Sequence, residues 1–222
     1  YNFICERGIT GGCYTTVFGQ MLLQEYRLPV EYLVVGGEKM TANPDSGIRL
    51  INTYGPTEFT VDATFFETEA GKTYDNIPIG RPLYNQTAFV VDNTMNLVPQ
   101  GVAGELCLYG PQMAMGYWNK PEKTAEVFVA CPFVGRENAK MYRTGDLVMC
   151  NEDGQVEYLV RIDRQVKLRG FRIEMGEIEN HAMEIDGMGQ AIAEVKRLND
   201  SDHLVLYYTV AEGATLTDAA VQ

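Results

Sequence analysis

The sequence is poor in the residues that carry most nucleophilic and metal-dependent chemistry. Its 222 residues include only two histidines and five cysteines, and no cysteine pair has the Cys-x-x-Cys spacing typical of zinc sites. Neither His181 nor His203 lies in a serine or cysteine motif, which argues against a hydrolytic triad. The odd number and wide scatter of the cysteines disfavour a disulfide framework, so we expect reduced, mostly buried thiols.

Long apolar runs, phosphate-binding loops and excess positive charge are absent as well. No apolar run approaches the ~18 residues of a membrane span, and no basic segment precedes an apolar stretch at the N-terminus, so we expect a cytoplasmic protein with no membrane partner. The Gly-Gly pairs at 11–12 and 36–37 do not complete a Walker or dinucleotide fingerprint. With 30 acidic against 18 basic residues, the net charge of -12 disfavours nucleic acid as a partner.

What remains predicts a folded α/β protein of mixed α+β type, with 45% hydrophobic and 22% charged residues. We expect one large unit at 1–162 and a small, incomplete α+β unit at 163–222. Apolar periodicity and turn residues set the expected elements. The expected helices are 15–26, 119–129 and 176–185, and the expected strands are 32–35, 48–53, 59–66, 87–91, 104–109, 147–150 and 203–209.

Chemistry is first expected where the strand at 48–53 ends, in the sequence NTYGPTE (52–58). Strand ends are the usual ligand positions in open α/β sheets. Tyr54 offers a flat ring to a base, and the Thr57 hydroxyl beside the Glu58 carboxylate can hold Mg²⁺ against phosphate oxygens. The competing interpretation is a plain connection between a strand and a turn.

Two further segments are candidates. In YRTGDL (142–147), a carboxylate at a glycine turn, Asp146, can accept both hydroxyls of a ribose, although a capped β-turn explains the same residues. The segment 161–172 carries five basic residues around Gly170 in an otherwise acidic chain. It is either a place where the backbone approaches an anionic ligand or a solvated charged face.

Together, these segments resemble the adenylation domains of nonribosomal peptide synthetases, in the superfamily of adenylate-forming enzymes. The resemblance covers nearly the whole chain and rests on four motifs in a fixed order. They are NTYGPTE (52–58), GELCLYG (104–110) with GYW (116–118), YRTGDL (142–147), and RIDRQVKLRGFRIE (161–174) with GEIE (176–179).

The resemblance implies ATP-dependent activation of an amino acid as an aminoacyl-adenylate, then transfer to the phosphopantetheine thiol of a carrier-protein domain. ATP and Mg²⁺ would be the cofactors, and adjacent synthetase domains the other partners. By the resemblance, Asn52 and Tyr54 would contact adenine with Thr53 beside them, and Glu58 would bind Mg²⁺ with Thr57 near the phosphates. Asp146 would bind the ribose, and Arg161 would make a second contact with the ribose or a phosphate. Asp163 would be the hinge between two domain arrangements, and Lys167 and Gly170 would face the nucleotide and the thiol tunnel in the second arrangement.

The resemblance also implies a side-chain pocket for the amino acid, formed by Cys13, Val34, Gly36, Thr53, Val61 and Asp62. Gly36 leaves room for a side chain, whereas Thr53 and Asp62 bring a hydroxyl and a carboxylate near its tip. Because a buried carboxylate left unpaired costs about 1–3 kcal/mol or more, we expect a hydrogen-bonding amino acid over Leu, Val or Phe. Alternatively, Asp62 turns to the surface or pairs with a structural arginine.

The match has limits. The family's phosphate loop and amine-binding aspartate are expected upstream of Tyr1 and its catalytic lysine beyond Gln222, so an internal fragment, inactive alone, is expected. Val160 stands where the family usually has glycine. A D-alanine or acyl activating ligase, including acyl-coenzyme A synthetases, remains an alternative, although Pro56 and DRQVK (163–167) favour the peptide-synthetase branch. The other alternative is a non-catalytic module with a degenerate adenylation fold.

Overall fold

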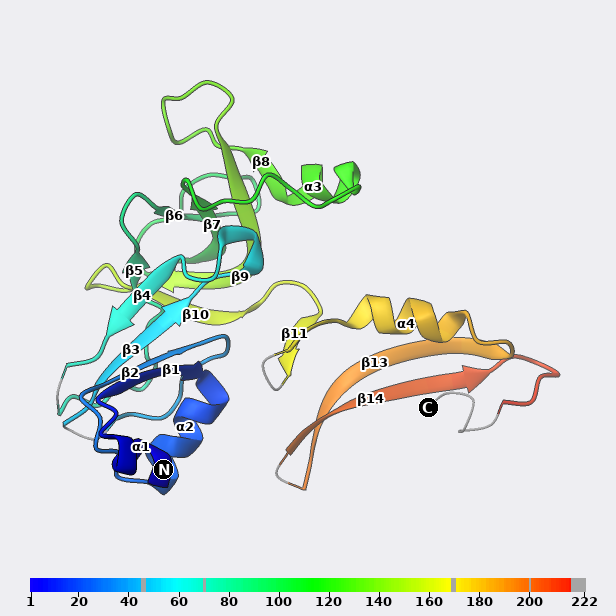
Figure 1. The fold of residues 1–222 in the computed structure, drawn as a ribbon. Coiled ribbons are helices and arrows are strands. Elements are labelled where there is room, and N and C mark those ends of the chain that lie inside the picture. Colours follow the sequence, from blue (N-terminus) through cyan, green and yellow to red (C-terminus); the bar gives the residue numbers. More distant parts are fainter. Residues whose placement is uncertain (45–46, 70, 169–170, 200, 217–222) are drawn as a thin grey trace. The chain divides into compact units, whose positions relative to one another are not determined.

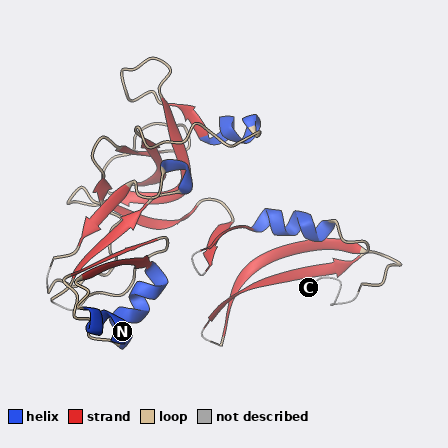
Figure 2. Ribbon diagram, viewed as in Figure 1, coloured by secondary structure: helices blue, strands red, loops and turns tan. Residues whose placement is uncertain are grey.

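A computed structural model describes residues 1–44, 47–69, 71–168, 171–199 and 201–216. The chain divides into two compact units, Tyr1–Ile162 (unit 1) and Asp163–Gln222 (unit 2). The mixed α+β fold class is confirmed, with both helices and strands in each unit (Figure 2). In the described part of the chain, no helix is long and apolar enough to span a membrane.

The first sheet of unit 1 is built from five strands in the order β1-β2-β3-β4-β5. β1, β2 and β3 are parallel, and β4 and β5 add antiparallel to the edge (Figure 1). The helical and extended elements of this part are α1 (Asn2–Arg7), β1 (Gly11–Thr15), α2 (Thr16–Glu25), β2 (Tyr32–Gly36), β3 (Arg49–Tyr54), the 3₁₀ helix η1 (Thr57–Phe59), β4 (Thr64–Glu67) and β5 (Arg81–Pro82).

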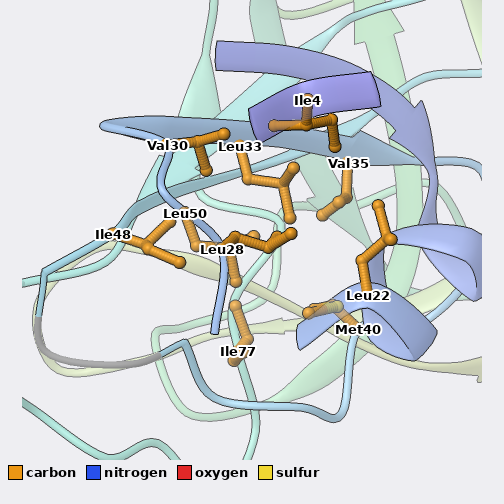
Figure 3. Packing of buried hydrophobic residues seen from close by; sticks show 10 residues of the cluster. All are labelled: Ile4, Leu22, Leu28, Val30, Leu33, Val35, Met40, Ile48, Leu50 and Ile77. Atoms are coloured by element: carbon orange, nitrogen blue, oxygen red, sulfur yellow. The ribbon is translucent and has the colours of Figure 1, made fainter. Parts of the chain in front are cut away.

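One face of this sheet is covered by α1 and α2, because alternate residues of β2 and β3 are apolar. Leu33, Val35 and Leu50 are fully buried and pack with Ile4 of α1 and Leu22 of α2 (Figure 3). At roughly 25 cal/mol per Å², burying each such aliphatic side chain contributes about 1.5–3 kcal/mol. This packing fixes β2 and β3, so the opposite face of the same strands is available for function.

The second sheet of unit 1 is antiparallel, in the order β10-β9-β7-β6, with β8 paired to β9. Its elements are β6 (Thr87–Val91), β7 (Ala103–Tyr109), α3 (Pro121–Val127), β8 (Phe128–Ala130), β9 (Lys140–Cys150) and β10 (Val156–Arg161). A bridge between Gly80 and Val156 joins the two sheets, with both backbone N–H···O contacts at 2.9 and 3.1 Å. The two sheets are thereby held in one unit.

The described residues of unit 2 form two hairpins and one helix. Its elements are β11 (Gln165–Leu168), β12 (Phe171–Glu174), α4 (Met175–Met183), β13 (Met188–Leu198) and β14 (Ser201–Val210). Helix α4 lies along the β13–β14 hairpin (Figures 1 and 2). The fully buried Ala193 of β13 is small enough to let the helix approach the sheet.

Four expectations from the sequence need correction. Residues 59–61 belong to η1 and a turn rather than a strand, which begins only at Thr64. YRTGDL lies inside the long strand β9, not at a turn. In α2 the apolar stripe is mostly exposed, and Leu22 is buried with the small residues Thr16 and Gly19. Only two of the five thiols, Cys107 and Cys131, are buried.

Candidate functional site

The segment 52–58 leaves the first sheet as predicted, from the end of β3 through Gly55-Pro56 into η1. Asn52 is buried, and its Nδ2 donates to the Pro78 carbonyl at 2.8 Å. Its Oδ1 is also buried and has no hydrogen-bond partner in the described structure. An unpaired buried acceptor costs about 1–3 kcal/mol, so this carbonyl oxygen is suited to a ligand that donates a hydrogen bond.

The Asp146 carboxylate is the point at which three of the motifs meet. Its Oδ2 accepts a hydrogen bond from the Tyr54 hydroxyl, and its Oδ1 accepts one from Arg161 Nη1 at 3.1 Å. Asp146 and Tyr54 are buried, and the Arg161 side chain is 15% exposed. Burial, followed by the charge of Asp146, raises the pKa of Tyr54, which therefore stays protonated as a donor. Because a carboxylate offers about four lone-pair sites, Asp146 retains capacity for sugar hydroxyls.

A β-bulge explains why Asp146 projects from the middle of a strand. The register between β7 and β9 shifts around Thr144–Asp146, and Gly145 adopts a φ of 69° that favours glycine. The Thr144 hydroxyl bonds the Leu106 carbonyl at 2.8 Å and accepts the Asp146 N–H at 3.0 Å. Bulges of this kind redirect a side chain, and this one directs Asp146 toward Tyr54.

Glu105, from the GELCLYG motif, holds the other side of this bulge. Its Oε2 accepts two hydrogen bonds from Arg143, at 3.0 and 2.7 Å, and its Oε1 accepts the Gly145 N–H at 3.2 Å. The Glu105 side chain is 10% exposed, so this pair is better shielded than a surface ion pair. The second and third motifs therefore form one structural assembly that positions Asp146.

Glu58 lies in η1 and is only 6% exposed. Its Oε1 accepts a hydrogen bond from the Tyr117 hydroxyl, and its backbone carbonyl accepts the Ala114 N–H at 2.8 Å. Burial and then the hydrogen bond to Glu58 raise the pKa of Tyr117, so the phenol remains a donor. Thr57, the neighbouring candidate, is exposed.

The donor set suits Mg²⁺ bound together with a nucleotide. The described residues contain no group of three or more His, Cys, Asp or Glu side chains that could hold a metal alone. Mg²⁺ is commonly bound through one or two carboxylates and substrate phosphates rather than an all-protein cage. Glu58 beside the exposed Thr57 hydroxyl provides one such carboxylate.

Four of the predicted pocket residues share one face of the first sheet, opposite the face covered by α1 and α2. Cys13 is in register with Val34 across β1 and β2, and Gly36 is in register with Thr53 across β2 and β3. A Cβ at Gly36 would lie 2.6 Å from Thr53 Oγ1, so glycine is required for this close approach. The Thr53 hydroxyl donates to the Val35 carbonyl at 3.2 Å.

The other two pocket candidates lie in a strained turn. Thr60 and Val61 have φ values of 54° and 71°, a region that a β-branched residue rarely adopts. Val61 is 72% exposed, and Asp62 is half-buried. Gly55 accommodates this turn, since a Cβ there would lie 2.2 Å from the Val61 carbonyl oxygen. The expected strand at this position is therefore a turn, and these two side chains are not in register with the four on the sheet face.

In unit 2, the candidates lie near the start of the unit. Asp163 is exposed and its Oδ1 accepts the Gln165 N–H at 3.0 Å. Lys167 is exposed on β11, in register with Arg172 of β12. Gly170 and Arg169 lie outside the described residues. Arg164, one of the five basic residues of 161–172, donates to Glu179 through both terminal nitrogens, at 3.0 and 2.8 Å.

Sequence reasoning missed Tyr117, Glu105 and Ile51. Tyr117 and Glu105 support Glu58 and Asp146, and Ile51 lies in register with Val34 on the pocket face. Tyr117 and Glu105 belong to the quoted motifs, which indicates that they matter. No local sequence pattern, however, identifies the residues that they contact, because those residues lie far away in the chain. Ile51 could have been found from strand alternation, because it is two residues before Thr53.

Comparison with known proteins identifies the family. A family model described as AMP-binding enzyme matches residues 1–118. The chain is 45% identical over 181 residues to a component of the mycosubtilin synthase of Bacillus subtilis, and 45% identical over 185 residues to a component of the linear gramicidin synthase of Brevibacillus parabrevis. Each match covers 82% of this chain but only 7% and 4% of those relatives, so the chain spans a small part of their length.

The fold is also similar to that of solved adenylation domains of nonribosomal peptide synthetases. A solved nonribosomal peptide synthetase protein containing adenylation and carrier (PCP) domains is 26% identical, with a TM-score of 0.81 over 96% of this chain and 45% of that chain. An artificially fused adenylation–PCP di-domain from Klebsiella oxytoca shares the fold, with a TM-score of 0.78 at 21% identity over 99% of this chain and 42% of that chain. The chain therefore belongs to the AMP-binding enzyme family of adenylate-forming ligases, with the adenylation domains of nonribosomal peptide synthetases.

Proposed function

We propose that the protein carrying this chain activates an amino acid with Mg·ATP and passes it to the phosphopantetheine thiol of a carrier-protein domain. The observation that carries the proposal is the convergence of Tyr54, Asp146 and Arg161 at one buried carboxylate. In the first half-reaction, a carboxylate oxygen of the amino acid attacks the α-phosphorus of ATP and pyrophosphate leaves. In the second, the thiol attacks the acyl carbon and AMP leaves.

The nucleotide is proposed to bind between the end of β3 and the bulge of β9. The buried Asn52 Oδ1 would accept a hydrogen bond from the exocyclic amine of adenine, removing the penalty of an unpaired acceptor. The Asp146 carboxylate would accept ribose hydroxyls, with the hydrogen bond from Arg161 orienting it. Tyr54 would contribute its ring to adenine while its hydroxyl stays on Asp146.

Glu58 is proposed to bind the Mg²⁺ ion that accompanies ATP, with the Thr57 hydroxyl near the phosphates. When bound, the ion neutralises charge that develops on the phosphate oxygens. The task of this chain is to hold the carboxylate in a fixed orientation. The buried position of Glu58 and its two contacts with the segment around Ala114 and Tyr117 support this role.

The two half-reactions are proposed to use different positions of unit 2, turning at Asp163. The division between the compact units falls between Ile162 and Asp163, which supports a hinge there. Lys167, exposed on the β11–β12 hairpin, would face the nucleotide in the second arrangement, and Gly170 would line the path of the thiol. The partners are the carrier domain and neighbouring synthetase domains.

The amino acid side chain is proposed to lie on the face formed by Cys13, Val34, Gly36 and Thr53, with Val61 and Asp62 nearby. A side chain with a hydrogen-bonding group is favoured, because it would satisfy the Asp62 carboxylate and the Thr53 hydroxyl. The peptide-synthetase relatives favour an amino acid over a fatty acyl substrate, and retention of Glu58, Asp146 and Arg161 favours an active domain over a degenerate one.

Amino-acid-dependent exchange of radioactive pyrophosphate into ATP tests the function in the protein that carries residues 1–222. We expect exchange with a polar or cationic amino acid, and a changed preference in Asp62→Asn. Ile51→Val, on the sheet face that carries Val34 and Thr53, is the control for a general disturbance of the pocket. Exchange with no amino acid would contradict the function; a wild-type preference for Leu or Phe that persists in Asp62→Asn would remove Asp62 from the pocket.

A further inference from the structure

Glu58 is contacted by the loop 110–118, which lies between β7 and α3 (Figure 1). This loop contacts both its side chain, through the Tyr117 hydroxyl, and its backbone carbonyl, through the Ala114 N–H at 2.8 Å. η1 is only three residues long, so its own backbone hydrogen bonds give the carboxylate little support. The orientation of Glu58 therefore depends on a segment more than fifty residues away.

Tyr117 is itself fixed from two directions. Its backbone N–H donates to the Thr124 hydroxyl of α3 at 2.9 Å, and its ring packs edge-on against Phe128, with centroids 5.8 Å apart. Gly116 makes this approach possible, because a Cβ there would lie 2.4 Å from Thr124 Cγ2. The φ of Gly116 is 145°, in the region that favours glycine. A residue held at both backbone and ring can hold its hydroxyl in one place.

We propose that Tyr117 is a positioning residue that orients the Glu58 carboxylate for the nucleotide-bound Mg²⁺, acting through Glu58 rather than on substrate. The inference rests on the proposed function and assigns a task to the GYW motif, whose role in this chain was otherwise unexplained. The physical reason is that a phenol donating to one carboxylate oxygen restricts rotation of the whole group. Partners of this kind, one step removed from a metal, typically change metal affinity 10- to 100-fold when removed.

The test measures metal dependence in the full protein that carries this chain. In Tyr117→Phe, which keeps the ring and its packing, the Mg²⁺ concentration for half-maximal pyrophosphate exchange is expected to rise about tenfold. The KM for the amino acid is expected to stay constant, which a general structural defect would not allow. Binding of Mn²⁺ with ATP, followed by electron paramagnetic resonance, is expected to weaken by a similar factor and requires no turnover.

Matched variants separate positioning from folding. Tyr109→Phe removes a hydroxyl from the last residue of β7, in a different packing cluster from Tyr117, and should leave the Mg²⁺ dependence unchanged. Thr124→Val removes the hydroxyl that holds Tyr117 and should shift the dependence in the same direction, whereas Thr124→Ser, which keeps it, should not.

The two ideas fail in different ways. The proposed function is overturned if the wild-type protein binds Mn·ATP but none of the amino acids tested supports pyrophosphate exchange. A wild-type protein that exchanges normally, with unchanged Mg²⁺ half-saturation and Mn²⁺ binding in Tyr117→Phe, overturns the role of Tyr117. A parallel shift in Tyr109→Phe would also overturn it, because the effect would then not be specific to Glu58.

Discussion

In unit 1, the buried side chains form three clusters that cover both sheets, whereas the described part of unit 2 buries few apolar residues. Its buried apolar residues are Met175, Ala182, Met188 and Ala193. The β13–β14 hairpin, by contrast, exposes 55% of Ile192 and 50% of Tyr207. A unit with a large apolar core is thus followed by one with a small core, which suits the proposed division between a fixed nucleotide site and a moving element.

Polar contacts differ between the units in the same way. Around Asp146, the ion pair with Arg161 is nearly buried, with side chains 5% and 15% exposed. Around Glu179, the ion pair with Arg164 has the arginine 61% exposed. Buried pairs are sensitive to loss of one partner, whereas exposed pairs contribute little. Substitutions in unit 1 should therefore have larger effects than comparable ones in unit 2.

The largest effect is expected for Asp146→Ala. It removes the carboxylate proposed to hold ribose, which also accepts hydrogen bonds from Arg161 and from the buried Tyr54 hydroxyl. Loss of one electrostatic group of this kind typically lowers rates ~10²–10³-fold. Both adenylation and thiolation should fall, measured by pyrophosphate exchange and by loading of a carrier domain. Asp146→Asn, which keeps an acceptor, should lose less; equal activity in wild type and Asp146→Ala would contradict the site.

The cores can be compared directly with two apolar truncations. Leu33→Ala, at a fully buried position of β2, should lower the free energy of unfolding by about 2–5 kcal/mol. Ile192→Ala, at a position 55% exposed on β13, should change it by less than about 0.5 kcal/mol. Urea unfolding followed by circular dichroism measures both. A large loss in Ile192→Ala would show that this face of unit 2 is covered in solution.

Lys167→Ala should separate the two half-reactions. Because Lys167 is exposed on β11, its removal should leave stability and pyrophosphate exchange nearly unchanged. Loading of the carrier domain should fall about tenfold, the effect of losing one charged hydrogen bond. Asp163→Pro, which restricts the proposed hinge, should follow the same pattern. Equal losses of exchange and loading in both variants would argue against a role confined to the second step.

A smaller effect concerns the pH dependence of unit 2. Hydrogen bonding from the Ala193 N–H, then from Arg164, lowers the pKa of Glu179. A lowered folded pKa stabilises the fold above the unfolded pKa, and the contribution is lost as pH falls through the folded value. Glu179→Gln should therefore be less stable than wild type near pH 7, and the difference in thermal midpoint should vanish well below the ordinary value of 4.5. A difference independent of pH would contradict this account.

The elements predicted best are those whose ends are marked locally. β2, β3 and β6 begin and end within about a residue of expectation, because apolar runs meet Gly, Pro or Asp at their ends. β9 was misjudged for the same reason, since Gly145 indicates a turn by composition but occupies a bulge. A glycine turn and a glycine bulge both require a positive φ, and only the pairing of β9 with β7 distinguishes a bulge from a turn.

The site was predictable to the extent that each motif is continuous in sequence. The contacts that orient its carboxylates are not, because Tyr117 is 59 residues from Glu58 and Arg143 is 38 residues from Glu105. Periodicity and turn chemistry describe neighbours within one element and contain no information about such partners. The role of Asp146 could therefore be expected from sequence, whereas the residues that support it required the fold.

The smallest effect uses the cysteines to compare buried and open parts of unit 1. Burial, then the charge of Glu105, raises the pKa of Cys107 to about 12, so its reactive thiolate is scarce at pH 8. Cys13 is exposed on the proposed substrate face, and Cys5 is exposed in α1, away from it. Iodoacetamide, with labelled sites read by mass spectrometry, should modify Cys5 and Cys13 in the native protein and Cys107 only after denaturation.

Saturating ATP and the cognate amino acid should slow labelling of Cys13 but not of Cys5, because only Cys13 lies on the face proposed to bind the side chain. Equal protection of both thiols would indicate a general tightening of unit 1, and no protection of Cys13 would remove it from the pocket.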